Sequence, residues 1–129
     1  MPVDEKNVAC DMDSSLLRAK ALLDSPVSNK GCAFDLEERR DKGLLGHLPY
    51  RVETIEDQVA RHYEQFCAFP TPMGKNIYLN ALLNNNEILF FNLLSCHLQE
   101  MLPIIYTPTV GEAVESFSLQ FRRERGLYI

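Results

Sequence analysis

The sequence of 129 residues predicts a mostly α-helical fold, and three observations lead to this prediction. Apolar residues recur in several segments at the three- and four-residue spacing of a helix face. Helix start and stop signals separate these segments. No stretch of any length alternates as a half-buried strand does, apart from the short run 103–106. We expect one multi-helix domain, residues 15–129, after a flexible tail, residues 1–14.

The first two predicted helices are short. Leucines at helical spacing begin at about Ser15, and the segment stops at Asp24 before Ser25-Pro26. Asp35 followed three residues later by Glu38 predicts a capping box for the second helix. This helix is expected to end at Gly43, which suits a C-cap position. The apolar piece 44–49 is interpreted as a linker.

Two longer helices are predicted in the middle of the chain. One follows Thr54 and ends before Phe69. Its apolar face consists of Ile55, Val59, His62, Tyr63 and Phe66. The next is expected from Met73 to Leu83, where the three asparagines 84–86 break it. The residues that this helix places together are Ile77, Tyr78, Ala81 and Leu82.

The last two predicted helices include the most apolar one. With Asn86 as its cap, a helix from Glu87 to about Leu102 is apolar almost all round, which is typical of a central position. A final helix is expected from about 110 to 123, with Gly126 able to stop it. Thr109 and Glu112 have the spacing of a capping box for that helix.

Composition and charge exclude several classes of function. The net charge of −5 is the wrong sign for binding a phosphate backbone, so no nucleic-acid partner is expected. No apolar run approaches the ~18–20 residues that span a bilayer, so no membrane partner is expected. The N-terminus has no leader pattern, and the chain is interpreted as cytoplasmic.

The cysteines and histidines form no recognisable metal motif. Four cysteines spread tens of residues apart favour reduced thiols, and the three histidines have no zinc-site spacing. None of the glycines forms Gly-x-Gly, so no dinucleotide loop is present. We therefore predict neither metal-binding nor cofactor-binding residues within this chain.

Tyr106 is the leading candidate for chemistry. It lies between Pro103 and Pro108, which restrict the local backbone, and just ahead of the helix start expected near Val110. The free amides of a helix start favour a negative charge nearby, so an anionic substrate is reasonable there. The alternative is the commoner case of a buried tyrosine whose hydroxyl is satisfied at a helix entrance.

Six segments occur in an order typical of one family. They are Asn29-Lys30-Gly31-Cys32-Ala33-Phe34, Gly43-Leu44-Leu45-Gly46-His47-Leu48-Pro49, Asn76-Ile77-Tyr78-Leu79, Asn86-Glu87-Ile88-Leu89-Phe90-Phe91, Met101-Leu102-Pro103-Ile104-Ile105-Tyr106-Thr107-Pro108-Thr109-Val110-Gly111-Glu112-Ala113 and Phe121-Arg122-Arg123-Glu124-Arg125-Gly126-Leu127-Tyr128-Ile129. From about residue 22 onward the chain resembles the N-terminal domain of the malic enzymes (decarboxylating malate dehydrogenases). The long motif around Tyr106 makes the resemblance specific.

The resemblance implies an activity. Malic enzymes convert (S)-malate to pyruvate and CO2 with NAD or NADP and a divalent metal, Mg2+ or Mn2+. The motif tyrosine, here Tyr106, is the general acid that protonates enolpyruvate. Phenols ordinarily ionise near pH ~10, so they carry a proton to give at neutral pH.

The resemblance also implies what this chain lacks. The family's lysine base, metal-binding carboxylates and Rossmann domain lie beyond residue 129. The chain is therefore expected to be a fragment that is inactive when isolated. The complete enzyme is expected to be a homo-dimer or homo-tetramer. The alternative is a non-catalytic helical interaction or oligomerisation module derived from a malic enzyme.

Two arginine features have alternative interpretations. Some family members bind an anion at a pair of arginines in the subunit interface, and these two positions align with Arg61 and Asn85. Because Asn85 has an amide where the second guanidinium would be, bidentate binding of a dicarboxylate is lost there. Otherwise, Arg61 is expected on a solvated face, paired with Asp57. The run 122–125 is interpreted as a solvated end of the last helix, with an anion-binding or interface role as the alternative.

Overall fold

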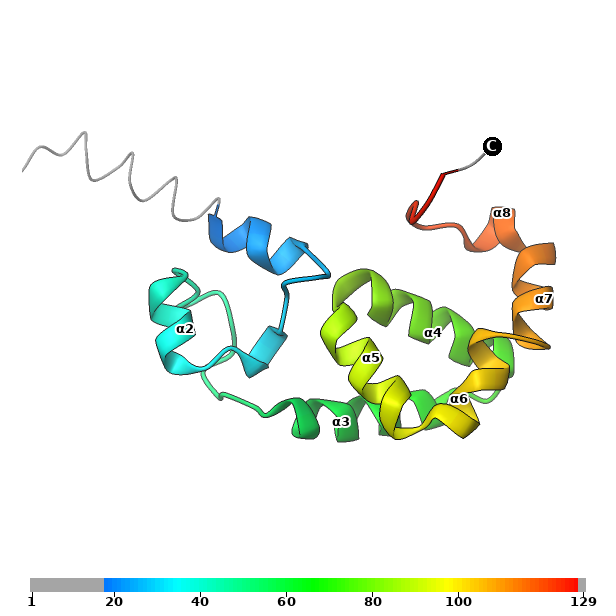
Figure 1. The fold of residues 1–129 in the computed structure, drawn as a ribbon, viewed down its shortest axis with the longest axis horizontal. Coiled ribbons are helices and arrows are strands. Elements are labelled where there is room, and N and C mark those ends of the chain that lie inside the picture. The colour runs from blue at the N-terminus through cyan, green and yellow to red at the C-terminus, as the bar shows by residue number, and fades with distance from the viewer. Residues whose placement is uncertain (1–17, 128–129) are drawn as a thin grey trace, which may run out of the picture.

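The computed structural model describes residues 18–127, which are helical with no β-strand in that range (Figure 1). A helix over residues 18–24 opens the described part. The following elements are η1 (Gly31–Ala33), α2 (Leu36–Asp41), α3 (Ile55–Ala68), α4 (Pro72–Asn85), α5 (Glu87–Cys96), α6 (Leu98–Ile105), α7 (Thr109–Glu115) and α8 (Phe117–Gln120). The mostly α prediction is confirmed for these residues. The predicted tail 1–14 and the start of the first predicted helix lie outside them.

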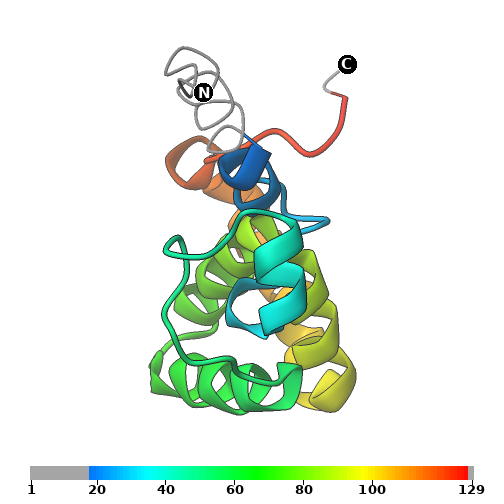
Figure 2. The same cartoon turned by 90° about the vertical axis from the view of Figure 1, so that its left-hand side faces the viewer.

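The larger hydrophobic core lies where α3, α4, α5 and α6 pack together (Figure 2). Its buried members are Val59, Phe66, Leu79, Leu82, Leu89, Phe90, Leu93, Met101 and Ile104. Burying a large apolar side chain of this kind contributes about 1.5–3 kcal/mol. The predicted apolar face of α3 is confirmed for four of its five residues, since Val59 and Phe66 are buried while Ile55 and Tyr63 pack at the edge of the core. The fifth, His62, is half-buried and does not belong to this core.

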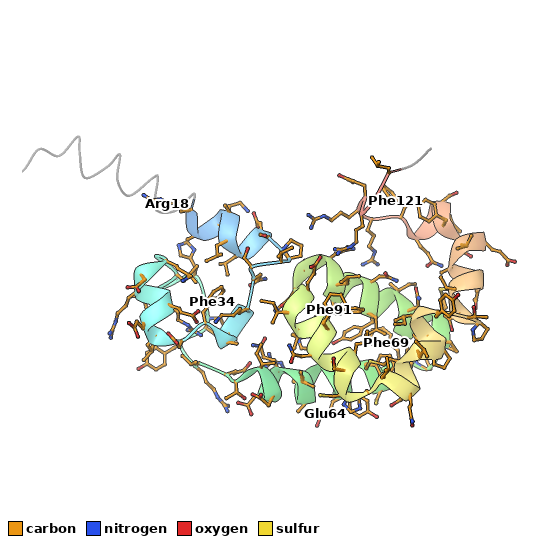
Figure 3. The ribbon with its side chains drawn as sticks, viewed as in Figure 1. Arg18, Phe34, Glu64, Phe69, Phe91 and Phe121 are labelled. Carbon is orange, nitrogen blue, oxygen red and sulfur yellow. The ribbon has the colours of Figure 1, made fainter. Side chains whose placement is uncertain are left out.

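A smaller core lies beside α2, in the N-terminal part of the described chain. It consists of Ala19, Phe34 and Leu44, with Phe34 between α2 and residues 18–24 (Figure 3). Arg39 of α2 is also buried here, only 3% exposed. Its guanidinium donates to four carbonyl oxygens, those of Phe34 (2.7 Å), Pro49 (2.7 Å), Cys32 (3.0 Å) and Arg51 (3.3 Å). The Arg39 side chain therefore links the backbone segments on both sides of α2.

Several predicted helix boundaries are confirmed by their caps. Asp35 and Glu38 form the predicted capping box, and Gly43 follows α2 with a φ of 67°. Such a positive φ favours glycine. Thr54 caps α3 in a box with Asp57, and the side chain of Asn86 accepts from the Leu89 N–H at 3.0 Å.

Replacing Asn86 with alanine is expected to lower the free energy of unfolding by about 1–2 kcal/mol. The Asn86 side chain is buried, and its loss leaves an N–H at the start of α5 without an acceptor. Urea unfolding would measure the change. Asn92→Ala is the matched control, because Asn92 is exposed and bonds only to Ile88 of its own helix. An equal loss in both variants would contradict the proposed capping effect.

The prediction of one helix from 87 to 102 is wrong. The helix breaks at His97, where φ is −129° and ψ is 34°, and resumes as α6. The His97 ring stacks on Tyr63 of α3 with centroids 3.7 Å apart and planes 4° apart, which holds the break in place. Beyond it, Met101 and Ile104 turn into the core, and α6 continues through Pro103 to Ile105. The prediction that the helix ends near Leu102 is therefore also wrong.

In the described chain, no single helix has the length and apolar character to cross a bilayer. Taken together, α5 and the stretch Leu98–Glu115 would pass that test by length and composition only, and they are bent by 119°. Buried side chains of α5 and α6 belong to the larger core.

The buried face of α4 differs from the predicted one. Its fully buried residues are Asn76, Leu79 and Leu82, whereas Ile77 and Ala81 are only half-buried. The reason is that α4 packs against α5 along one side and against α6 and α7 along another, so no single apolar stripe sets its orientation. The helix also runs two residues further than predicted, through Asn85.

The predicted final helix is interrupted and shorter. It breaks at Ser116 and ends at Gln120. The predicted capping box of Thr109 and Glu112 is wrong, because α7 already includes Thr109 and Pro108 takes the N-cap position. The Thr109 side chain is buried and makes no cap hydrogen bond.

The prediction that the arginine run 122–125 forms the end of the last helix is wrong, because the run follows α8 outside any helix. Its residues are exposed, as predicted. Arg123 donates to the Asn84 carbonyl at 3.2 Å, and Arg125 donates to the Leu83 carbonyl at 3.4 Å and pairs with Glu87. These cations therefore lie at the C-terminal end of α4, where the helix dipole is negative. In Figure 1 this segment runs back from α8 and lies above α4.

Candidate functional site

Tyr106 lies at the junction of α6 and α7 and is 66% exposed. Its backbone is fixed on both sides: its N–H donates to the Leu102 carbonyl at 2.9 Å, and its carbonyl accepts from Val110 at 2.8 Å. No side chain among residues 18–127 bonds to its hydroxyl. The alternative of a buried tyrosine with a satisfied hydroxyl is therefore wrong, because the Tyr106 side chain is exposed on the described part of the molecule.

Helix α4 also holds the junction of α6 and α7 in place. The side-chain amide of Asn76 donates to the Ile104 carbonyl at 2.8 Å, two residues before Tyr106. Thr109, three residues after Tyr106, is buried. The backbone on each side of the exposed tyrosine therefore belongs to the packed interior.

Tyr106 lines neither of two pockets found on the described part of the molecule. One of about 440 Å3 lies between α4, α7, α8 and the segment after α8. In its wall the Asn84 Oδ1 is buried without a hydrogen-bond donor. The other, of about 430 Å3, is lined mainly by α3 and α5, with Tyr63, Cys96 and His97. The exposed phenol of Tyr106 therefore lies outside both of these pockets.

Arg61 pairs with Glu53 and not, as predicted, with Asp57. Its Nη1 lies 2.5 Å and 2.6 Å from the two Glu53 carboxylate oxygens. This hydrogen bond raises the pKa of Arg61 above its usual value. Asp57 is instead engaged in the capping box of α3. Asn85 is exposed at the end of α4, where its carbonyl accepts from Asn29, and no described hydrogen bond joins it to Arg61.

The described chain holds no group of three or more histidine, cysteine, aspartate or glutamate side chains that could bind a metal ion. Cys32, Cys67 and Cys96 are free thiols. Reduced thiols stay a prediction, and Cys10 lies outside the described residues.

A polar cluster between α3 and α4 was not predicted from the sequence. The Tyr78 hydroxyl lies 2.6 Å from Nδ1 of His62 and 2.9 Å from Oε1 of Gln65. Burial raises the pKa of Tyr78 to about 12. Burial also lowers the pKa of His62, and the nearby Arg61 adds to this effect. No sequence signal could have paired residues 62 and 78, because they come together only when α3 and α4 pack.

The stability of the chain is expected to fall as the pH drops below ~6.5, the ordinary pKa of histidine. Because the folded state lowers the pKa of His62, the unfolded chain takes up the proton first, which favours unfolding. Urea unfolding at pH values from 7.5 to 5.5, about one unit on either side of that pKa, would measure how steeply the free energy of unfolding changes with pH. His62→Gln should flatten this slope, whereas the exposed His47→Gln should not. An unchanged slope in His62→Gln would refute the assignment.

Comparison with known protein families identifies the domain. Residues 83–129, which include Tyr106 and its flanking helices, match the family model "Malic enzyme, N-terminal domain". The chain is 54% identical over 108 residues to "NAD-dependent malic enzyme 2" of Vibrio vulnificus, covering 84% of this chain and 19% of the relative.

Two further relatives agree with this match. "NAD-dependent malic enzyme 3" of Bacillus subtilis is 53% identical over 113 residues, covering 88% of this chain and 20% of the relative. "NAD-dependent malic enzyme" of Aeromonas salmonicida is 56% identical over 109 residues, covering 84% and 19%. The chain therefore spans about one fifth of the length of the curated relatives that it matches.

The fold and these matches define the class as a helical N-terminal domain of an oxidoreductase family. That family is the malic enzymes, and the chain belongs to it.

Proposed function

We propose that this chain is the N-terminal part of a malic enzyme that oxidises (S)-malate with NAD and releases pyruvate and CO2, with Tyr106 as the general acid. The observation that carries the proposal is the state of Tyr106. It is exposed, its backbone is held on both sides, and it lies within the segment that matches the family model.

In the proposed reaction, loss of CO2 from the oxidised substrate leaves enolpyruvate, which needs a proton on its methylene carbon. The Tyr106 phenol donates this proton, and the electron pair of the enol forms the new C–H bond while the enol oxygen becomes the ketone of pyruvate. A base elsewhere in the complete protein must take up the proton that the enol hydroxyl releases, and a proton must return to the phenolate before the next turnover.

NAD is the proposed cofactor because the relatives carry it in their names. A divalent metal, Mg2+ or Mn2+, and the use of NADP in place of NAD remain predictions from the resemblance. The described residues fit neither group, since they offer no cluster of metal ligands and no Gly-x-Gly loop. Both would be held by other parts of the complete protein. On the same grounds, residues 1–129 alone are proposed to be inactive.

The test is an assay of the complete protein that carries this sequence, purified from its own source. Malate-dependent reduction of NAD with equimolar pyruvate would support the proposal, and absence of pyruvate would overturn it. NADP in a parallel assay measures the cofactor preference. Residues 1–129, purified separately, should give no turnover in the same assay.

The second candidate is a non-catalytic interaction or oligomerisation module. It is favoured by the apolar side chains exposed beyond Gly111, namely Val114, Phe117, Leu119, Phe121 and Leu127. As part of a malic enzyme, the same surface would serve subunit or domain contacts in a homo-dimer or homo-tetramer, in the cytoplasm. A short native product that binds subunits without turning over malate would favour this candidate.

Regulation by an anion at Arg61 remains a separate prediction. Glu53 already forms two hydrogen bonds with this guanidinium, so an incoming dicarboxylate must displace a carboxylate of the chain. The neutral Asn85 adds no positive charge to compensate for that displacement.

A further inference from the structure

The last turn of α6 has a hydrogen-bonding gap. In an α-helix a carbonyl accepts from the N–H four residues later. For the Ile104 carbonyl this residue is Pro108, which has no N–H. Within the described residues, no backbone N–H donates to this carbonyl. Since Ile104 is buried, its oxygen needs another donor.

Asn76 supplies that donor from another helix. Its Nδ2 lies 2.8 Å from the Ile104 carbonyl oxygen, and the side chain is only 3% exposed. Asn80, one turn further along α4, donates to Oδ1 of Asn76 at 2.9 Å. Because Oδ1 is occupied as an acceptor, the amide of Asn76 is oriented with its donor toward Ile104.

We propose that Asn76 is a positioning residue for Tyr106, acting through the Ile104 carbonyl. This inference rests on the proposed function of Tyr106. The hydrogen bond fixes the end of α6 to α4, and Tyr106 follows two residues later as the C-cap of that helix. Together with the bonds from Tyr106 to Leu102 and Val110, it holds the backbone that carries the phenol.

A small displacement of this backbone matters because proton transfer to carbon depends on position. A shift of about 1 Å in a catalytic group can cost about 100-fold in rate. Packing alone does not require a polar side chain at position 76, since leucines fill the neighbouring buried positions 79 and 82 of α4. The amide at 76 therefore has a role in direction and not merely in packing.

The test uses the complete protein and compares two steps. Hydride transfer is followed as NADH formed in a single turnover, and proton transfer as exchange of pyruvate methyl hydrogens with D2O. Asn76→Asp keeps the shape but replaces the donor with an acceptor. We expect it to lower methyl exchange about 10- to 100-fold while single-turnover NADH formation changes less than about twofold.

A parallel fall of both steps, or no fall in exchange, would overturn the proposal, because a merely structural role affects both steps alike. If Asn76→Asp fails to fold, Asn80→Ala replaces it. This variant keeps Asn76 and removes the two hydrogen bonds that Asn80 donates to it, one to Oδ1 at 2.9 Å and one to the backbone carbonyl at 3.0 Å. It should lower methyl exchange several-fold with NADH formation unchanged, and unchanged exchange would overturn the proposal. Asn92→Ala is the control and should alter neither step.

The outcome separates this inference from the proposed function itself. If Tyr106→Phe abolishes methyl exchange and the Asn76 and Asn80 variants do not lower it, positioning by Asn76 is wrong and the proposed acid stands. If Tyr106→Phe leaves the exchange intact, the role of Tyr106 is wrong, and the positioning role of Asn76 fails with it.

Discussion

Replacing Tyr106 with phenylalanine in the complete protein is expected to lower the turnover of malate to pyruvate by about 10²- to 10⁴-fold, the range for general acid catalysis. The substitution removes only the hydroxyl and keeps the ring. Because the phenol is the proposed proton donor to enolpyruvate, the loss should appear in the proton-transfer step. Steady-state kinetics and methyl hydrogen exchange of pyruvate would measure it.

Folding should be unaffected by this change. The Tyr106 side chain is 66% exposed, and no described residue bonds to its hydroxyl, so the urea midpoint should stay the same. Tyr50→Phe is the matched control, because Tyr50 is 94% exposed and lies far along the chain from the α6–α7 junction. If the turnover of Tyr106→Phe stays within a few-fold of that of the unsubstituted protein, Tyr106 is not the general acid.

Replacing Arg39 with methionine is expected to lower the free energy of unfolding by about 3–5 kcal/mol. The four carbonyl groups that Arg39 joins lie on both sides of α2, and no other side chain among the described residues donates to them. The Cys32 carbonyl would keep one donor, the Glu53 N–H at 3.0 Å. Each buried carbonyl left without a donor costs about 1–3 kcal/mol, while the partly exposed ones can recover water. Urea unfolding of the chain would measure the loss.

The matched control is Arg40→Met, which changes the same side chain one position later on the exposed face of α2. It should alter the free energy of unfolding by less than about 0.5 kcal/mol. Arg39→Lys should also destabilise, because one ammonium group cannot reproduce the planar fork that reaches four acceptors. Equal effects at positions 39 and 40 would contradict the role given to the buried guanidinium.

The sequence alone determined the class of fold and most helix starts. The caps at Asp35, Thr54 and Asn86 were predictable because a capping side chain bonds to an amide only two or three residues away. The motif around Tyr106 was sufficient to indicate the malic enzyme family, to which the chain belongs. It did not reveal whether the phenol is buried, since exposure depends on what the rest of the chain covers.

The tertiary structure decided the features that join distant residues. His97 breaks the central helix where it stacks on Tyr63, 34 positions earlier in the sequence, and the arginines after α8 contact the end of α4. Asn76 of α4 donates to the Ile104 carbonyl, which accepts from no backbone N–H among the described residues. Sequence patterns report interactions within one or two helical turns, whereas ring stacking, buried guanidinium bonds and side-chain-to-carbonyl bonds form only after the helices pack. For that reason the sequence located the tyrosine, and the packing of α4 against α6 and α7 determined how it is held.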